Sequence, residues 1–173
     1  SLGHKVPKSA VSDYLEWFED AYFLFTVRIF DASLARANTN PKKIYCIDHS
    51  MVTSVASGIL INSGHLLENL VFTAIRRFHP NIYYYRSKNG REVDFIVQSN
   101  KRTRTLIQVC ESLSDPQIRK RELTAISEAM TELKLKSGII VTRNDTEQIE
   151  TDENIIHILP AWRFLLNLPE LIE

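Results

Sequence analysis

The chain lacks several features that define large classes of protein. It has only two cysteines, Cys46 and Cys110, in 173 residues. This is too few for a disulfide framework and indicates a reduced, intracellular protein, which we expect to be cytoplasmic. No apolar run approaches the roughly 20 residues that a membrane-spanning helix needs, and the N-terminus has no signal-peptide core. The sequence therefore predicts neither a membrane protein nor a secreted one.

An excess of charge of either sign is also missing. The 21 basic residues balance the 21 acidic residues, so the formal net charge is zero. Such a chain has no global attraction to nucleic acid or to an anionic membrane, although basic loops such as Lys42-Lys43 could still contact phosphates. The five histidines are scattered without the spacing of zinc ligands, and no GxxxxGK[ST] motif is present. We therefore expect no zinc site and no ATP site in this part of the protein.

The first 50 residues predict a helix followed by a two-stranded ribbon. Lys8–Ala21 carries apolar residues at helical spacing, and Tyr22–Phe30 and Ile44–Asp48 have the composition of strands. The polar segment Asp31–Lys43 predicts a loop between them. This order is similar to the back half of a winged helix, so we expect a partial winged helix or linker at 1–50. Because the chain begins just before a helix, we also expect a fragment of a longer protein.

Residues 62–173 predict an α/β domain. A helix, a meander of three strands, a long helix and a buried strand follow one another, which implies a mixed sheet flanked by helices. The expected elements are a helix at His65–Phe78, strands at Ile82–Arg86, Glu92–Gln98 and Thr105–Glu111, a helix that begins at Asp115-Pro116, a strand at Ser137–Thr142, a charged loop at Arg143–Asn154, a strand at Ile155–Leu159 and a helix at Ala161–Leu168.

Two carboxylates share one face of the second expected strand. Side chains at positions i and i+2 of a strand point the same way, so Glu92 and Asp94 are expected on one face and Val93 and Phe95 on the other. Paired carboxylates resist joint ionisation unless a cation or a proton lies between them, and a hard divalent metal suits such a pair. The plainer interpretation is an exposed edge strand on which Arg86 or Arg91 pairs with these acids.

The order of these elements and acids resembles the PD-(D/E)XK nuclease superfamily, whose core is restriction-endonuclease-like. The matching positions are Glu68 in GHLLEN, Asp94 in EVDF and Gln108 in IQVC. More closely, residues from about 9 to 168 resemble an uncharacterised C-terminal domain found after a bacterial or archaeal AAA-type ATPase module. The motifs that carry this resemblance are GHLLENLVF, IYYYRSKNGREVDFIV, LIQVC, KREL and ILPAWRFLL.

The resemblance implies catalytic roles for Glu68, Asp94 and Gln108, and a Mg²⁺ or Mn²⁺ ion held by Asp94, Glu68 and Glu92. The chain departs from the pattern at Cys110, which stands where the family has a lysine. A neutral thiol supplies no positive charge and prefers soft metals. Lys120 and Arg121, beside Glu122, are the candidates for a relocated base.

Two functions from different classes follow. The first is a metal-dependent nuclease, or a degenerate relative that binds DNA or other nucleic acid without cutting it. The second is an inactive interaction module that docks onto an upstream AAA-type ATPase module of the same protein or associates with itself. Each acid also has a structural interpretation: Glu68 could pair with His65 one turn earlier, and Cys110 could be a buried thiol. The expected partners exclude a membrane.

Overall fold

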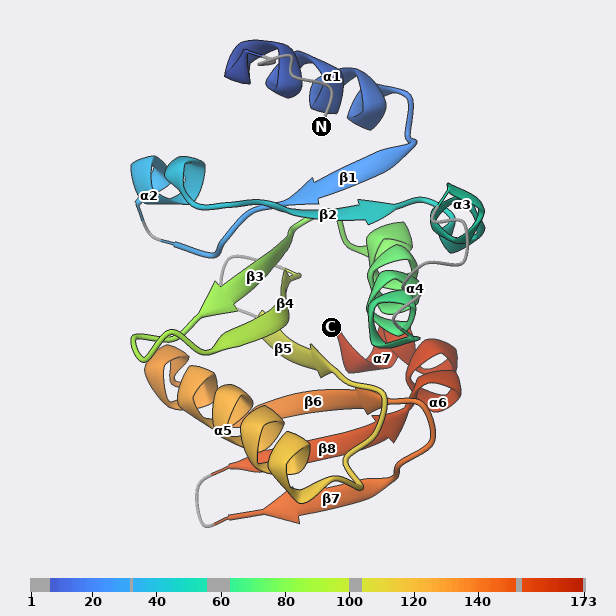
Figure 1. Cartoon of the computed structure of the whole chain (residues 1–173). Coiled ribbons are helices and arrows are strands. Elements are labelled where there is room, and N and C mark those ends of the chain that lie inside the picture. Colours follow the sequence, from blue (N-terminus) through green and yellow to red (C-terminus); the bar gives the residue numbers. More distant parts are fainter. Residues whose placement is uncertain (1–6, 32, 56–62, 100–103, 152–153, 173) are drawn as a thin grey trace.

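The computed structural model describes residues 7–31, 33–55, 63–99, 104–151 and 154–172. Within them the chain forms a six-stranded mixed sheet with helices on both faces and a separate two-stranded ribbon (Figure 1). The elements are α1 (Lys8–Asp20), β1 (Leu24–Val27), α2 (Leu34–Thr39), β2 (Lys43–Cys46), α3 (His49–Val55), α4 (Ser63–Phe78), β3 (Ile82–Arg86), β4 (Glu92–Gln98), β5 (Arg104–Val109), α5 (Pro116–Leu133), β6 (Ser137–Thr142), β7 (Glu147–Glu150), β8 (Ile155–Pro160), α6 (Ala161–Leu166) and α7 (Leu168–Leu171).

The six-stranded sheet has the strand order β3-β4-β5-β6-β8-β7. Strands β3, β4 and β5 form an antiparallel meander, and β6 then pairs parallel to β5 after the crossover through α5. Strand β8 is parallel to β6, and β7 closes the edge antiparallel to β8. Helices α4, α6 and α7 contribute to the core on one face, and α5 covers the other (Figure 1). The predicted mixed α/β architecture is therefore confirmed.

Helix α5 is fixed by local signals that the sequence carries. The side chain of Asp115 accepts hydrogen bonds from the backbone N–H groups of Gln117 and Ile118, and Pro116 occupies the first helical position. The helix ends at Lys134, which has a left-handed backbone with a φ of 57°. These caps set where α5 begins, beside the end of β5.

Strand β4 contains a β-bulge that changes which side chains share a face. Tyr83 pairs with Ile96 but Tyr85 pairs with Val93, so Asp94 and Phe95 together lie opposite the single residue between the two tyrosines. Val93 packs in the core on the α5 side, whereas Phe95 packs in the core on the α4 side. The prediction that these two apolar residues share a face is therefore wrong, because strict alternation fails at a bulge.

Three elements were not predicted. Helix α2 lies within the segment expected to be a loop, and α3 follows the ribbon. Strand β7 lies within the expected charged loop at Arg143–Asn154. It is an edge strand whose side chains mostly face water, and only Ile149 of β7 is partly buried. Its polar composition therefore did not indicate a strand. The terminal helix is divided into α6 and α7 around Asn167. The connection between β4 and β5 at residues 100–103, where the sequence predicts a turn, lies outside the described residues.

The β1–β2 ribbon packs against the α4 side of the domain. Its strands are antiparallel, with Leu24 opposite Cys46. The buried side chains of Phe25 and Tyr45 belong to the same apolar core as Phe72 of α4. The described residues of the ribbon strands pair only with each other, so the ribbon is a separate sheet laid on the domain (Figure 1). The division into a winged-helix remnant at 1–50 and a domain at 62–173 stays a prediction.

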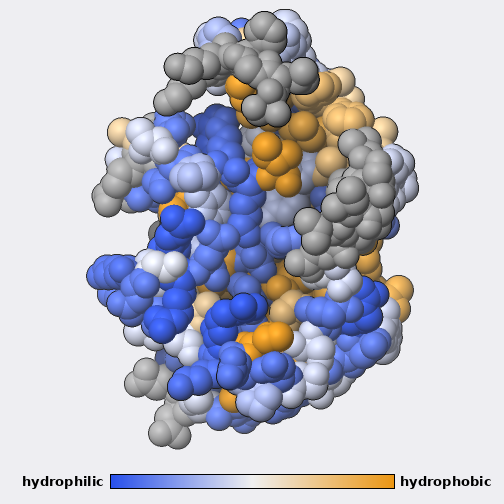
Figure 2. Space-filling model, viewed as in Figure 1, coloured by the Kyte–Doolittle hydropathy of each residue, from blue (hydrophilic) through white to orange (hydrophobic). Residues whose placement is uncertain are grey.

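Hydropathy is uneven over the surface. Figure 2 shows hydrophobic residues gathered near the top of the molecule, over the region of α1 and the ribbon, and a mostly hydrophilic lower half. We call the patch formed by the exposed side chains of Tyr14, Trp17 and Phe18 the α1 surface. Within the described residues, no helix is both long enough and apolar enough to cross a membrane.

Candidate functional site

Three carboxylates from two elements converge on one ammonium group. Lys43 Nζ lies 3.0 Å from Glu68 Oε1, 3.0 Å from Glu92 Oε1 and 2.7 Å from Asp94 Oδ1. Glu68 projects from the N-terminal half of α4, and the other two acids project from β4. The structure thus brings together all three carboxylates that the sequence suggested as metal ligands. We call them, with Lys43, the acidic cluster.

Lys43 is the residue of the cluster that sequence reasoning missed. It is the first residue of β2, and the sequence placed it at the end of a loop as one of two adjacent basic residues. Its neighbour Lys42 is exposed, whereas the Lys43 side chain keeps only 22% of its surface accessible. The contact with Asp94 joins positions 51 residues apart, and no local pattern reports a contact of that range.

Specific contacts hold the ribbon in register over the cluster. The Tyr45 hydroxyl donates to Glu68 Oε1 at 2.7 Å, and the Tyr45 ring stacks on Phe72 with centroids 4.3 Å apart. The Asn69 side chain accepts from the backbone N–H of Cys46 and donates to its carbonyl, at 2.9 and 3.0 Å. Lys43 is therefore placed among the carboxylates by its neighbours in β2.

Gln108 lies next to Asp94, but its amide is already engaged. The backbone N–H of Asp94 donates to Gln108 Oε1 at 3.2 Å, and Gln108 Nε2 donates to Glu122 Oε2 at 2.7 Å. The second oxygen of Asp94 accepts from the backbone N–H of Val109 at 2.9 Å. These bonds fix the orientation of Asp94, and they leave Gln108 as a support for Asp94 within the β4–β5 pair.

The position expected to hold a lysine carries no positive charge. Cys110 is buried, and burial together with the negative charges of Glu122, Asp145 and Asp94 raises the pKa of its thiol to about 12. The thiol is therefore neutral at physiological pH. Of the two candidates for a relocated base, Arg121 lines the same cleft as Cys110, and its guanidinium is paired with Glu122. Lys120 does not line that cleft.

Burial and charge together shape the titration of the cluster. Burial and the nearby Glu68 carboxylate raise the pKa of Asp94 to about 7, although the Lys43 ammonium acts in the opposite direction. Burial opposes the charge on Lys43, but Asp94, Glu68 and Glu92 outweigh it and raise the pKa of the ammonium above its ordinary value. Burial likewise opposes the charge on Glu92, yet Arg86 and Lys43 lower its pKa.

Two hollows meet at the acidic cluster. One, of about 540 Å³, lies between the N-terminal ends of α4 and α5, where Glu68, Asp94, Gln108 and Arg121 line it. The other, of about 490 Å³, lies on the ribbon side and is lined by Lys43 together with Glu68 and Asp94. Glu68 and Asp94 thus line both hollows.

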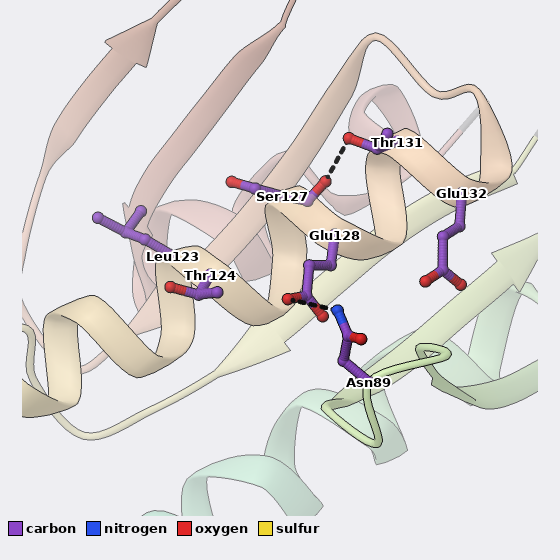
Figure 3. Close-up of a pocket in the computed structure, with 7 residues that line it drawn as sticks. All are labelled: Asn89, Leu123, Thr124, Ser127, Glu128, Thr131 and Glu132. Atoms are coloured by element: carbon purple, nitrogen blue, oxygen red, sulfur yellow. Dashed lines mark hydrogen bonds between the residues drawn. The ribbon is translucent and has the colours of Figure 1, made fainter.

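A third hollow, of about 540 Å³, lies between the β3–β4 turn and the outer face of α5. Figure 3 shows Glu128 pointing toward Asn89, whose side-chain amide donates to Glu128 Oε1 at 3.1 Å. The backbone N–H of Lys88 donates to Glu132 at 3.0 Å. Because both acids bind the turn to α5, we assign this hollow a structural role.

The donor set partly fits a hard metal ion. Carboxylate oxygens are the ligands that Mg²⁺ and Mn²⁺ prefer, and Glu68 and Asp94 lie close enough to share one cation. However, that cation is the Lys43 ammonium. Among the residues that the structure describes, no three His, Cys, Asp or Glu side chains are arranged to hold a metal ion. As arranged, the described residues of this site hold an ammonium group and do not form a set of ligands for a metal ion.

Known proteins share sequence with most of this chain. A curated relative, an uncharacterized protein of Methanocaldococcus jannaschii, is 35% identical over 172 residues, which cover 94% of this chain and 37% of the relative. The chain thus spans well under half the length of that archaeal relative. A refined half-complex of Thermococcus gammatolerans McrB AAA+ hexamers with bound McrC contains a chain of weakly similar structure, with 10% identity and a TM-score of 0.47. That likeness covers 66% of this chain and 34% of the other. Residues 63–164 match the family model described as "Domain of unknown function (DUF4143)", so the chain belongs to the DUF4143 family.

Proposed function

We propose that this chain is a degenerate PD-(D/E)XK-like domain of a longer AAA-type ATPase, and that it serves as an interaction module and does not cleave nucleic acid. Two features support the fold assignment: the antiparallel meander followed by a crossover helix and a parallel strand, and the convergence of Glu68 with Asp94. The link to an ATPase comes from the motif resemblance in the sequence.

The position of Lys43 is the observation that carries this proposal. Metal-assisted phosphodiester hydrolysis needs a divalent cation to neutralise the phosphate and to activate water. Here an ammonium lies between the carboxylates that would bind that cation. An ammonium has three N–H groups, and three carboxylate oxygens lie within 3.0 Å of Lys43 Nζ. The ammonium of Lys43 is therefore paired with carboxylates and is not free to orient a water molecule.

Nucleic-acid binding at the cleft is also disfavoured by charge. The cleft beside α5 is lined by acidic side chains, namely Glu68, Asp94, Glu111, Asp115 and Glu122. Its one arginine, Arg121, is paired with Glu122. Phosphate contacts are normally made by clusters of lysine and arginine, and a net negative lining repels a phosphate backbone. The cleft is thus poorly suited to DNA or RNA.

The α1 surface is the place where we expect the module to dock. Trp17 is 62% exposed and Tyr14 is 51% exposed, and the two rings contact each other edge to face. Exposed aromatic groups in one patch are typical of protein interfaces. We assign this surface to the remainder of the longer protein, because the archaeal relative extends well beyond the region that this chain matches.

A cleavage assay tests the proposal. Labelled DNA and RNA would be incubated with the wild-type domain and with Asp94→Asn, in Mg²⁺ and in Mn²⁺. We expect the two proteins to give the same low background, because the Lys43 ammonium lies where the carboxylates would hold a metal ion. Cys110→Lys extends the test by restoring the missing cation. Cleavage by the wild type that disappears in Asp94→Asn would overturn the proposal in favour of a nuclease.

A further inference from the structure

A separate hollow lies at the C-terminal end of α4, where that helix meets the ribbon. It has a volume of about 280 Å³, and its lining includes Tyr22, Phe25, Ile47, Arg76 and Arg77. Phe25 belongs to β1, Ile47 follows β2, and both arginines lie in the last turn of α4. We call it the arginine hollow. It shares no lining residue with the two hollows at the acidic cluster, so it is independent of that site.

The arginines give this hollow a positive charge that the described part of the chain does not neutralise. The Arg76 guanidinium lies over the buried Phe25 ring, 5.3 Å from its centre, which holds it against an apolar floor. Arg77 is exposed. Within the described residues neither forms an ion pair, whereas other arginines pair with glutamates, namely Arg86, Arg91, Arg119, Arg121 and Arg143. Free guanidinium groups beside apolar side chains suit a ligand that is both anionic and apolar.

Tyr22 has a backbone conformation that disfavours a bulky residue. Its φ is 55°, in the left-handed region. Its N–H donates to the carbonyl of Glu19, and the N–H of Phe23 donates to the carbonyl of Phe18, which is the pattern of a helix end that usually carries glycine. Burial does not offset the strain, since Tyr22 is 68% exposed and its ring meets Phe25 edge to face. Packing within the described residues does not account for a tyrosine here, whereas contact with a ligand does.

The arginine hollow borders the α1 surface. Phe18 of that surface packs against Phe23 with ring centroids 5.4 Å apart, and the preceding residue, Tyr22, lines the hollow. One partner can therefore contact the exposed aromatic rings and the arginines together. A phosphate backbone is normally bound by a larger set of lysines and arginines. Two arginines over an apolar floor favour a protein segment as the partner.

We propose that the arginine hollow binds an acidic segment of the remainder of the longer protein, in which a carboxylate lies next to an aromatic or large aliphatic side chain. The apolar group would enter beside Phe25 and Ile47, and the carboxylate would pair with Arg77. Tyrosine and arginine are also among the residue types that contribute most to protein interfaces. The archaeal relative has ample sequence for such a segment, because this chain covers only 37% of it. This inference rests on the proposed function, since it specifies the chemistry of the segment that docks.

Reversal of one charge tests the pairing. Calorimetry would measure binding between this domain and the remainder of the longer protein, expressed as a separate chain. Arg77→Glu changes an exposed side chain, and Arg163→Glu on α6 is the matched control, because Arg163 is also exposed and the change in net charge is the same. We expect Arg77→Glu to weaken binding at least about tenfold relative to wild type and to Arg163→Glu. The difference should narrow at high salt, because ions screen exposed charges.

Tyr22→Gly separates a binding role from a structural one. Glycine adopts a positive φ without strain, so the variant should unfold at the same urea concentration as wild type or at a higher one. We expect it nevertheless to bind the remainder of the longer protein severalfold more weakly. Lower stability with unchanged binding would show that Tyr22 serves the fold, and would overturn its place in the interface.

A photochemical cross-link identifies the segment that occupies the hollow. Tyr22 would be replaced by the photoreactive analogue benzoylphenylalanine, the complex with the separately expressed remainder would be irradiated, and the joined peptides would be identified by mass spectrometry. We expect cross-links to one segment that carries Asp or Glu within about two residues of an aromatic or large aliphatic residue. Cross-links to a segment without an acid, or only to a second copy of this chain, would contradict the proposal.

The outcomes distinguish this inference from the proposed function. If the remainder binds wild type and Arg77→Glu equally well, the domain still docks, but the arginine hollow is not part of the interface and the inference is wrong. If the remainder does not bind wild type at all, the docking role itself fails, and the inference fails with it.

Discussion

Asp94 shows how a folded environment changes the chemistry of a single side chain. It is a carboxylate buried at the bulge in β4, held by the backbone N–H of Val109 and influenced by the charges of Lys43 and Glu68. Burial favours its neutral form, and the adjacent Glu68 does the same. Lys43 opposes both effects, and the balance still raises the pKa of Asp94 to about 7.

The raised pKa of Asp94 predicts how stability depends on pH. In the unfolded chain this group loses its proton near pH 4, but in the folded chain it keeps the proton until about pH 7. The folded state therefore binds more protons between these values, and stability falls as pH rises through them. Relative to Asp94→Asn, which cannot titrate, the wild type should lose up to a few kcal/mol of unfolding free energy from pH 4 to pH 7.

Urea unfolding of both proteins at a series of pH values measures this difference. A difference that does not change across the window, or that grows in favour of the wild type, would contradict the raised pKa. The comparison cancels the titration of groups far from the cluster, because both proteins share them.

At this scale the sequence indicated that Glu68 and Asp94 lie together, and it missed Lys43 beside them. Glu68 and Asp94 could be paired because their motifs occur in a recognisable order along the chain. Lys43 could not be found, because a contact between the ribbon and β4 depends on how two separate sheets pack. The role of Gln108 could not be predicted either, because its side-chain amide donates a hydrogen bond to Glu122 in a later helix.

At the scale of elements, close packing between α5 and β6 depends on one glycine. An added Cβ at Gly138 would lie 2.8 Å from Ile126 Cδ1 and 3.0 Å from Met130 Sδ. Both side chains are fully buried, so neither can move away freely. The close approach of this helix to the sheet thus requires the absence of a side chain at this position.

Gly138→Ala should therefore destabilise the fold by about 1–3 kcal/mol, the usual cost of overpacking a core. The matched control is Ser137→Ala, one residue earlier at an exposed position of the same strand, which should change stability by less than about 0.5 kcal/mol. Thermal unfolding of the three proteins measures both effects. Equal stability of Gly138→Ala and wild type would show that α5 and β6 can separate without cost.

The elements most easily predicted were those with caps and strong apolar patterns. Asp115 and Pro116 indicated the start of α5, and Ser137–Thr142 matched β6 at both ends. The elements missed were short or polar, such as α2 and the edge strand β7, because hydrophobic periodicity reports burial and these elements have little. The bulge in β4 was not predicted either, because side chains alternate between the two faces only in a regular strand.

At the scale of the whole molecule, the proposed docking surface is separate from the acidic cluster. The acidic cluster lies inside, between the ribbon and the sheet, and the α1 surface lies outside. Helix α1 packs against β1, and β1 pairs with the strand that carries Lys43. Helix α1 is therefore joined to the acidic cluster through the two strands of the ribbon. The sequence predicted the mixed α/β architecture, but this connection appears only when the ribbon is seen against α4.

Substitution of Trp17 tests whether the longer protein docks at the α1 surface. Aromatic residues at the centre of an interface commonly contribute 2 kcal/mol or more to binding, so Trp17→Ala should weaken docking by about 30-fold. The control is Trp162→Ala on α6, because Trp162 is 61% exposed, close to the 62% of Trp17, and α6 lies apart from α1 (Figure 1). Binding would be measured between this domain and the remainder of the longer protein, expressed as a separate chain. Since both tryptophans are exposed, neither change should lower the stability of the domain by much. Equal weakening by both substitutions, or by neither, would show that the docking surface does not lie on α1.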